Sequence, residues 1–384
     1  MHILILFSAD IPVCDGIASH VVALAKRLRK RGYNITLMTR GNKCASIEEL
    51  EYEKFKVIKV PFYRLYPFHI YFHAFFVRKA IKDITPQPDL IHLHTPLVPP
   101  LPKKWPIVTT FHTPMLVDTA YVENIGLRTF LIKLMGKTTS YWIEKKLLNI
   151  SDAIITVSQG VAEELKTYYR YTNHLFVIPN VVDIDFYKPA TYFLNKKKLL
   201  YVGRLSYRKG LYEIVKSARY VAKKHPNVKY ALVGSGPLNK TLQSMINEMG
   251  LSSNFEFYGS IHDTSKILNF YQEACAVLIP SYYESGPITL LEAMSCGRAV
   301  ITTKTGLARG LVEDGVNGLL IKPKSVEELG EATIQLLSSE EMCKKLGEAA
   351  RKTIIEKMDA ERNTDMVEEV YNYALESFEK SRKC

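Results

Sequence analysis

Short apolar or β-branched runs alternate with amphipathic helical patterns along most of the chain, and this alternation constrains the fold more than any other feature of the sequence. The chain opens with a buried-strand pattern at 3–7, a helix pattern at about 17–31 and a second strand pattern at 35–39. Strands that alternate with helices are joined by crossover connections and lie parallel, with helices on both faces of the sheet. The sequence therefore predicts an α/β fold.

A polar break near residues 185–198 divides the alternation into two halves, and the pattern restarts at 199–202. The 384 residues are enough for two domains that each bury a core. We expect two Rossmann-like doubly wound parallel-sheet domains facing a cleft, at 1–187 and 198–362, and a C-terminal helix at 363–384 that packs back on the first domain. Such folds bind ligands at the carboxyl ends of their strands.

Composition excludes several classes of protein. Hydrophobic residues make up 47% of the chain and charged residues 23%, without a repetitive tract, so a disordered or fibrous protein is not expected. No apolar stretch is long enough to span a bilayer, and residues 1–7 are typical of a strand and not of a signal peptide, which predicts a cytoplasmic protein. The six cysteines include no C-x-x-C pair and no Cys/His cluster, so we expect neither a zinc site nor disulfides.

The net charge of +12 is spread over both halves of the chain and favours an anionic partner. Nucleic acid is not expected, because no motif that reads nucleic acid accompanies the charge. Phosphorylated small molecules and an anionic membrane surface remain as candidate partners. The run Lys26–Arg31 at the end of the first predicted helix fits either a membrane surface or the ordinary preference for cations at a helix carboxyl end.

Three predicted strand ends in the second half carry residues typical of a binding site. The first is followed by Gly203, Arg204 and Lys209, the second by Gly234 and Gly236, and the third by Glu284, Ile288, Thr289 and Glu292. Glycines let the backbone approach a ligand, Arg204 can grip a phosphate with its fork, and Lys209 adds a second positive charge. Ser285 could cap the helix that follows, and Pro287 suits its first position, so the free backbone N–H groups there would attract a phosphate.

Two carboxylates flank the start of that helix. Glu284 lies in the predicted loop and Glu292 lies about two turns further on, so they would meet different parts of an extended ligand. An ionised carboxylate accepts hydrogen bonds from two vicinal hydroxyls, as a ribose or a hexose presents them. Plainer explanations exist for each residue taken singly: Glu284 as a helix cap, Glu292 on a solvated helix face, Lys209 as a surface lysine and Gly234-Ser-Gly236 as a turn.

The first half contributes three further segments. Gly16 opens the helix after the first strand, and His112 ends a buried-strand pattern, where a lone histidine is often a core residue. The segment Phe62–Arg78 holds eight Phe or Tyr in 17 residues. It fits either a buried helix or an aromatic surface that holds a lipid or dips into a membrane interface.

These motifs resemble those of the GT-B fold glycosyltransferases, specifically the retaining family four, or group 1, enzymes. The resemblance covers nearly the whole chain and rests on Gly203-Arg204 with Lys209-Gly210, Gly234-Ser-Gly236-Pro237, Glu284 with Glu292, and Asp314-Gly315-Val-Asn317-Gly318. It implies that Arg204 and Lys209 hold the diphosphate of a sugar nucleotide, with the start of the helix at Ile288 and Thr289. It further implies that Glu292 holds the ribose and Glu284 the transferred sugar, and that Gly16 and His112 approach the donor.

The activity implied by the resemblance is transfer of a hexosyl group from a UDP- or GDP-linked sugar to a glycan or lipid acceptor, with retention at the anomeric carbon. The catalytic residues would be His112, Arg204, Lys209 and Glu284, and no metal or other cofactor is implied. Two alternatives stay open: a sugar-nucleotide epimerase of the same fold, and a non-catalytic membrane-docking protein that binds sugar nucleotides. A dinucleotide-dependent oxidoreductase fits less well, because Asn239 replaces the third glycine of G-x-G-x-x-G.

Some positions depart from the family pattern or match it weakly. Asp15 precedes Gly16 where the family usually has a second glycine, and the segment from Gly306 to Arg309 lacks a second glycine and an acid, so that Arg309 could add an anion contact of its own. Ser158 and Asn180 match weaker family positions. The D-x-D pattern of residues 183–185 is typical of a metal site in the other glycosyltransferase fold, but its place before the linker favours a cap.

Overall fold

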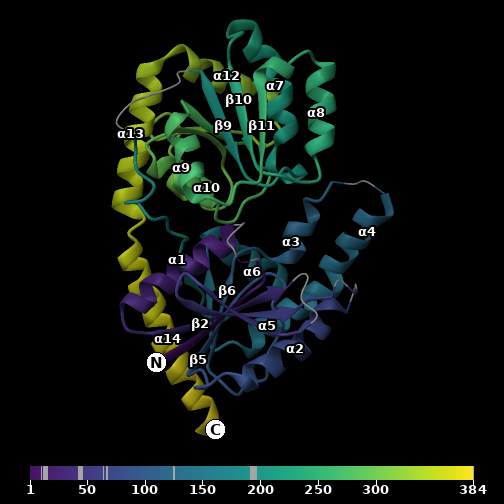
Figure 1. The fold of residues 1–384 in the computed structure, drawn as a ribbon, viewed down its shortest axis with the longest axis vertical. Helices are drawn as coiled ribbons and strands as arrows, with labels where there is room; N and C mark the ends of the chain where they lie inside the picture. The colour runs from purple at the N-terminus through teal and green to yellow at the C-terminus, as the bar shows by residue number, and fades with distance from the viewer. Residues whose placement is uncertain are drawn as a thin grey trace. The chain divides into compact units, whose positions relative to one another are not determined.

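The computed structural model describes residues 1–9, 11, 16–41, 46–63, 65, 68–123, 126–190 and 197–383. The chain forms two compact units, the first made of residues 1–180 with the C-terminal helix from Ala360, the second of Val181–Asp359 (Figure 1). The first boundary therefore lies before the expected 187. The reason is that Val182 and Tyr187 are buried in a core cluster of the second unit.

The first unit contains an eight-stranded sheet in the order β3-β4-β2-β1-β5-β6-β7-β8. Its strands are β1 (His2–Phe7), β2 (Asn34–Gly41), β3 (Glu48–Tyr52), β4 (Phe55–Pro61), β5 (Leu90–His94), β6 (Ile107–Phe111), β7 (Ala153–Thr156) and β8 (Phe176–Val177). Every pair is parallel except β3 with β4. The chain runs outward from β1 through β2 on one side and through β5 on the other, so the topological switch point lies between β1 and β5.

Helices cover both faces of this sheet. They are α1 (Gly16–Lys30), α2 (His69–Asp83), α3 (Met115–Ala120), α4 (Gly126–Met135), the π-helical turn Gly136–Ser140, α5 (Tyr141–Ile150), α6 (Gln159–Tyr169) and α14 (Ala360–Lys383). Alternate side chains of β1 point to opposite faces: Ile3 and Ile5 pack with α1 and α14, whereas Leu4 and Leu6 pack with α2, α5 and α6. The last helix thus lies on the first unit, beside α1 (Figure 1).

The second unit contains a six-stranded, all-parallel sheet in the order β11-β10-β9-β12-β13-β14. Its strands are β9 (Lys198–Val202), β10 (Lys229–Val233), β11 (Phe255–Gly259), β12 (Ala276–Ile279), β13 (Ala299–Thr303) and β14 (Leu319–Ile321). The chain runs outward from β9 through β10 and then returns to β12. The switch point of this unit therefore lies between β9 and β12.

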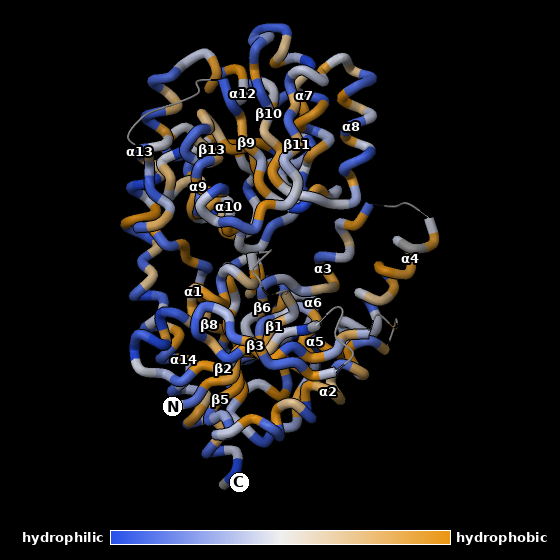
Figure 2. The backbone as a smooth tube through the Cα atoms, in the orientation of Figure 1, coloured by the Kyte–Doolittle hydropathy of each residue, from blue (hydrophilic) through white to orange (hydrophobic). Residues whose placement is uncertain are grey.

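The helices of the second unit pack on two core clusters. They are the 3₁₀ turn Tyr207–Lys209, α7 (Leu211–Lys224), α8 (Asn239–Glu248), the 3₁₀ turn Ser252–Asn254, α9 (Thr264–Glu273), α10 (Ile288–Ser295), α11 (Ala308–Leu311), α12 (Val326–Ser338) and α13 (Glu340–Lys357). Helices α7, α8 and α12 cover one face, and α9 and α10 cover the other. The central strands are hydrophobic over most of their length (Figure 2). The prediction of two doubly wound sheets is confirmed.

Candidate active site

The candidate site of the second unit is built on two loops that leave neighbouring strands. One loop follows β9 and carries Arg204 and Lys209; the other follows β12 and carries Glu284. Because β9 and β12 flank the switch point, the connections that leave them run in opposite directions along the sheet, and ligands usually bind outside the carboxyl ends of the strands at such a point. The sequence motifs therefore meet where a doubly wound sheet binds its ligand.

An ion pair joins these two loops. The Lys209 ammonium contacts Oε1 of Glu284, and the Ser281 hydroxyl donates to the same oxygen at 3.0 Å. Burial by itself would raise the pKa of Glu284, but the positive charges of Lys209 and Arg208 outweigh it, and the pKa of Glu284 is lowered. Glu284 is therefore an ionised carboxylate held in place and not a helix cap, and Lys209 is not a free surface lysine.

Arg204 is the exposed cation of the loop after β9. Its carbonyl oxygen accepts a hydrogen bond from the Tyr201 hydroxyl at 2.9 Å, which anchors the backbone. Within the described ranges, its guanidinium has no hydrogen-bond or ion-pair partner. Its fork is therefore available to an anion.

The glycines of the site have a structural reason that the sequence did not reveal. A Cβ on Gly234 would lie 1.9 Å from the carbonyl oxygen of Gly203, and a Cβ on Gly236 would lie 2.3 Å from that of Leu205. Both distances are far below van der Waals contact. These glycines let the loop after β10 pack against the loop after β9, whether or not a ligand is bound.

Helix α10 begins one residue later than the sequence suggests. Pro287 is the N-cap, and no side chain caps the helix, so the expectations that Ser285 caps it and that Pro287 takes its first position are wrong. The first helical residues are Ile288 and Thr289, whose amides follow directly from the β12 loop. A helix start without a capping side chain keeps N–H groups for an anion.

Glu292 lies one turn into α10 and is buried, with 8% of its surface exposed. The hydroxyl of Tyr271 donates to its Oε2 at 2.8 Å, and Tyr187 supplies a second hydrogen bond. Burial raises the pKa of Glu292 to about 7, although both hydrogen bonds lower it. A solvated helix face is therefore excluded, and the carboxyl group changes charge near neutral pH.

In the first unit, three histidines gather at the carboxyl ends of the strands beside the switch point. His20 lies in the second turn of α1, His94 ends β5 and His112 directly follows β6. His94 Nδ1 and His112 Nε2 are 3.0 Å apart, and the ring centroid of His20 lies 5.3 Å from that of His112. Burial lowers the pKa of all three, that of His112 to about 4, so the cluster is neutral at physiological pH. Gly16 is the exposed first residue of α1.

Two family models match the chain, one after the other. The model described as Glycosyltransferase Family 4 matches residues 14–186, and the model described as Glycosyl transferases group 1 matches residues 183–353. They meet close to the boundary between the two units. The chain belongs to the group 1 glycosyltransferases.

Individual proteins agree with this assignment. An uncharacterized glycosyltransferase of Methanocaldococcus jannaschii is 25% identical over 95% of this chain and 96% of its own length. The structure of sucrose-phosphate synthase from Thermosynechococcus elongatus has a TM-score of 0.82 and 19% identity, covering 97% of this chain and 98% of that chain. HepE from Anabaena, in complex with UDP and glucose, has a TM-score of 0.75 and 20% identity, covering 97% and 99%. These two likenesses show the GT-B fold.

The histidine cluster of this glycosyltransferase is also the group in the described part of the chain that could hold a metal ion. The nearest ligand atoms of the three side chains lie within 4.8 Å of one another. Zinc bound by imidazoles at ~2.1 Å would draw these atoms to about 3.4 Å apart, and the His94–His112 hydrogen bond already engages one nitrogen of each ring. Two other buried ring nitrogens, His20 Nδ1 and His94 Nε2, have no hydrogen-bond partner in the described part of the chain, and metal independence stays a prediction.

Sequence reasoning missed His20 and His94 as partners of His112. A signal was present, because His94 directly follows the run Leu90–Leu93, His112 directly follows the run Ile107–Phe111, and these two buried-strand patterns are consecutive in the chain. The tyrosines that hold Glu292 were also missed, since Tyr187 and Tyr271 are distant from it in the sequence. Of the two weaker candidates, Ser158 has a structural role: its hydroxyl caps α6 by accepting from the Val161 amide.

The D-x-D pattern forms a turn in this glycosyltransferase. Oδ1 of Asp183 accepts from the backbone N–H groups of Asp185 and Phe186, at 3.1 and 3.0 Å. The basic run at the end of α1 has partners inside the first unit. Arg31 pairs with Glu361, Asp365 and Glu368 of α14. Ordinary capping accounts for the D-x-D pattern, and pairing with α14 accounts for Arg31 of the basic run.

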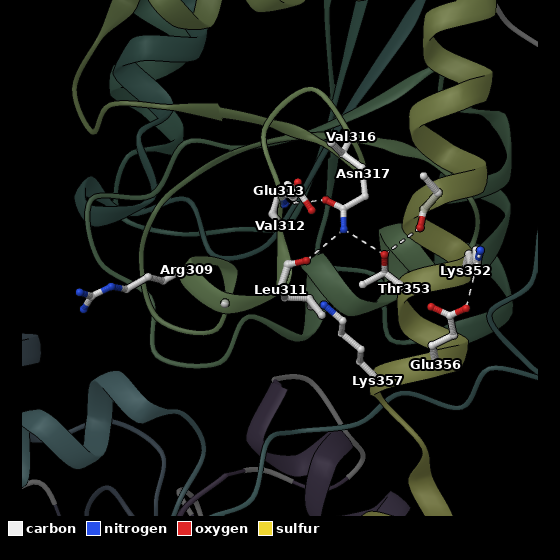
Figure 3. Close-up of a pocket in the computed structure, with 12 residues that line it drawn as sticks. Arg309, Leu311, Val312, Glu313, Val316, Asn317, Lys352, Thr353, Glu356 and Lys357 are labelled. Carbon is white, nitrogen blue, oxygen red and sulfur yellow. Dashed lines mark hydrogen bonds and ion pairs between the residues drawn. The ribbon is translucent and has the colours of Figure 1, made fainter.

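The family motif at Asp314–Gly318 also serves the fold. Asn317 is buried, its Nδ2 donates to the Leu311 carbonyl oxygen at 3.0 Å and to the Thr353 hydroxyl at 2.9 Å, and its Oδ1 accepts from the Glu313 amide at 2.7 Å. These bonds fasten the loop to α13 beside a cavity of about 400 Å³ (Figure 3). Arg309 extends away from Asn317 in this view, and its anion contact stays a prediction.

Proposed function

We propose that this glycosyltransferase transfers a hexosyl group from a nucleoside diphosphate sugar to an acceptor hydroxyl, with retention of the anomeric configuration. The observation that carries the proposal is the Lys209–Glu284 pair at the switch point of the second unit. It sets a cation and an ionised carboxylate side by side, one suited to a diphosphate and the other to sugar hydroxyls. HepE, a protein of the same fold, was solved with UDP and glucose.

The leaving diphosphate needs its charge neutralised. In the proposal, Arg204 and Lys209 contact the phosphate oxygens, and the amides at Ile288 and Thr289 add the positive end of the helix dipole. In the proposal, Gly203, Gly234 and Gly236 let the backbone of these loops approach the phosphates. As the negative charge grows on the diphosphate, these fixed donors stabilise the transition state more than the bound donor.

The two carboxylates orient the rest of the donor. Glu284 accepts hydrogen bonds from hydroxyls of the hexose, because Lys209 and Ser281 hold it ionised and fixed. Glu292 accepts from the ribose hydroxyls when it is ionised. We assign His112 to a hexose hydroxyl and Gly16 to close backbone approach. A neutral imidazole offers one donor and one acceptor, which suits a hydroxyl group.

Retention follows from where the acceptor attacks. The bond between the anomeric carbon and the diphosphate oxygen breaks, and the acceptor oxygen forms its bond to that carbon on the same face. The acceptor proton passes to the departing phosphate oxygen, so no side chain needs to be a strong base. Cationic side chains take the part that a metal ion plays elsewhere, and the proposal includes no metal. The acceptor is a glycan or a lipid.

A product assay tests the function. The purified protein is incubated with UDP- and GDP-linked hexoses, with and without glycan or lipid acceptors, and products are identified by mass spectrometry. We expect a glycoside only when donor and acceptor are both present, an anomeric coupling constant that matches the donor, and equal rates with and without EDTA. Conversion of the donor without any acceptor would instead indicate an epimerase, and binding without conversion would indicate a non-catalytic protein.

A further inference from the structure

The first unit exposes a stripe of aromatic side chains on α2 and the residue before it. Phe68, Tyr71, Phe72 and Phe75 are between 49% and 65% exposed. Their spacing of three and four residues places them on one side of the helix. The opposite side, with Ile70 and the rest of the buried residues, packs on the sheet. Of the two explanations for this aromatic segment, a fully buried helix is therefore wrong.

A second exposed apolar stripe runs along α4 and into α5. Its members are Leu127, Phe130, Leu131, Leu134 and Trp142, with exposed fractions between 45% and 74%. The helical path is unbroken from Gly126 to Ile150, because the π-helical turn joins α4 to α5. The apolar stretches of α4 are visible in Figure 2. Large apolar side chains scattered singly over a surface are ordinary, whereas stripes of this kind mark an interaction site.

Both stripes belong to the same side of the first unit. Helices α2 and α5 pack on one core cluster of the sheet, and α1 and α14 pack on the other. Figure 1 agrees, with α2, α4 and α5 on the side of the unit away from α1 and α14. We call the two stripes together the α2–α4 face.

Cations continue both stripes toward the C-terminal ends of the helices. On α2 they are Arg78, Lys79 and Lys82, and after α4 they are Lys137, Lys145 and Lys146. Lys145 also lies over the ring of Trp142, with its ammonium 5.6 Å from the centroid. Aromatic rings beside lysines match the boundary between headgroups and acyl chains in an anionic bilayer, where the rings enter and the ammonium groups meet phosphates.

The positive charge of the α2–α4 face distinguishes between the partners that could bind there. A second copy of the chain docked through the same face would bring two sets of lysines together, because a two-fold interface is self-complementary in position. An anionic bilayer instead neutralises them. No helix in the described part of the chain has the length and apolarity to cross a bilayer.

We propose that the α2–α4 face docks the first unit on an anionic membrane surface. The aromatic and aliphatic side chains enter the interface, and the lysines that continue each helix bind lipid phosphates. Arg31, just after α1, takes no part, since it is engaged with three acidic residues of α14. This inference goes beyond the transfer reaction and requires no bound sugar nucleotide.

The experiment is co-sedimentation of the full chain with vesicles of phosphatidylcholine alone or with added phosphatidylglycerol, without sugar nucleotide. We expect binding only to the anionic vesicles, and weakening as salt is raised. The double variant Phe72→Ser/Phe75→Ser should bind about tenfold or more weakly, and so should Leu131→Ser/Leu134→Ser. Replacing one lysine, as in Lys79→Gln, should weaken binding about fivefold.

A matched control is Tyr220→Ser on α7 of the second unit, which removes an aromatic ring of similar exposure and should leave binding unchanged. Circular dichroism melts verify that each variant is folded. Absence of binding to anionic vesicles, or binding that none of the α2–α4 variants weakens, would overturn the proposal. So would a dimer, seen by light scattering, that Phe72→Ser/Phe75→Ser dissociates. None of these outcomes bears on the transfer assay when that assay is run with a glycan acceptor.

Discussion

Among single residues, Lys209 and Glu284 are the most important for the proposed site, because Lys209 keeps Glu284 ionised and Glu284 holds the Lys209 ammonium in position. Without the ammonium, burial would raise the pKa of the carboxyl group, and without the carboxylate the cation would lose its anchor. A bound diphosphate offers Lys209 a second anionic partner. The pair is therefore a preorganised device that keeps both charges in place before the donor arrives.

Replacing Lys209 by Ala should lower kcat about 10²- to 10³-fold, the usual loss when one preorganised donor to a developing negative charge is removed. The measurement is steady-state transfer at saturating donor. Lys216→Ala is the control, since Lys216 is an exposed lysine of α7 in the same unit and should leave the rate unchanged. A Lys209→Ala enzyme within threefold of the wild type would contradict the assignment.

The raised pKa of Glu292 predicts that donor binding depends on pH. Its pKa of about 7 means that the ionised fraction, and with it the affinity for a nucleoside diphosphate, should rise about tenfold between pH 6 and pH 8. Calorimetric titration at both pH values checks this. In Glu292→Gln the rise should vanish, because glutamine does not titrate. An equal rise in wild type and variant would assign the dependence to another group.

The same carboxyl group affects stability with the opposite sign. Its pKa is raised on folding, so between about pH 4.5 and 7 the native state keeps a proton that the unfolded state releases. The free energy of unfolding should therefore fall as pH rises through this window, by up to about 3 kcal/mol. Glu292→Gln should lack this part of the decline, while Glu144, whose pKa burial also raises to about 7, keeps its own.

At the scale of elements, the site depends on loops that touch one another where adjacent strands end. The loop after β10 packs on the loop after β9 through glycines, and the Tyr282 amide donates to the Arg208 carbonyl oxygen at 2.7 Å, which links the loops after β12 and β9. The loops therefore support one another as a group. A substitution that displaces one of these loops should therefore also displace the neighbouring loop.

Gly234→Ala tests this packing. The added methyl group would meet the Gly203 carbonyl oxygen at 1.9 Å, and the backbone has a φ of +139°, which an alanine rarely adopts. We expect a loss of about 2–4 kcal/mol in unfolding free energy, from strain and overpacking together. Gly310→Ala on α11 is the control, with open space around its Cβ, and should be neutral or slightly stabilising. Similar melting of the two variants would refute the packing argument.

At the scale of the whole molecule, the chain completes its first unit only with its last helix. Val370, Tyr371 and Ala374 of α14 are fully buried against that unit, and the Tyr371 hydroxyl lies 2.8 Å from Nδ1 of His92 on β5. The first unit is therefore discontinuous in sequence, and the second is inserted within it.

Ending the chain at residue 359 should unfold or loosen the first unit and leave the second folded. The truncation uncovers the apolar face of β1 and α1 that α14 buries, and removes the acidic partners of Arg31. Scanning calorimetry of the truncated chain should then show one cooperative transition, that of the second unit. The full chain should show unfolding of both units. Glu379→Ala, an exposed change on α14, serves as the control. A truncated chain with unchanged melting would contradict this dependence.

Much of the architecture was predictable because its causes are local. The spacing of apolar residues in the strands and helices predicts two α/β units. Because the strands are parallel, their carboxyl ends bring Gly203, Lys209 and Glu284 to one edge of a sheet. The cap of α10 was mispredicted because Ser, Pro and Gly in succession allow several helix starts. The order of these residues in the sequence does not show which of the possible helix starts is the most stable.

The environment of each side chain had to come from the folded chain. The hydrogen bonds of Tyr187 and Tyr271 to Glu292, the gathering of His20 and His94 around His112, and the exposure of the α2 aromatics all arise between residues far apart in sequence or against a whole sheet. Periodicity records which residues are apolar, not which neighbour covers them. Burial and pairing set the charge on a buried carboxyl group, and both are properties of packing.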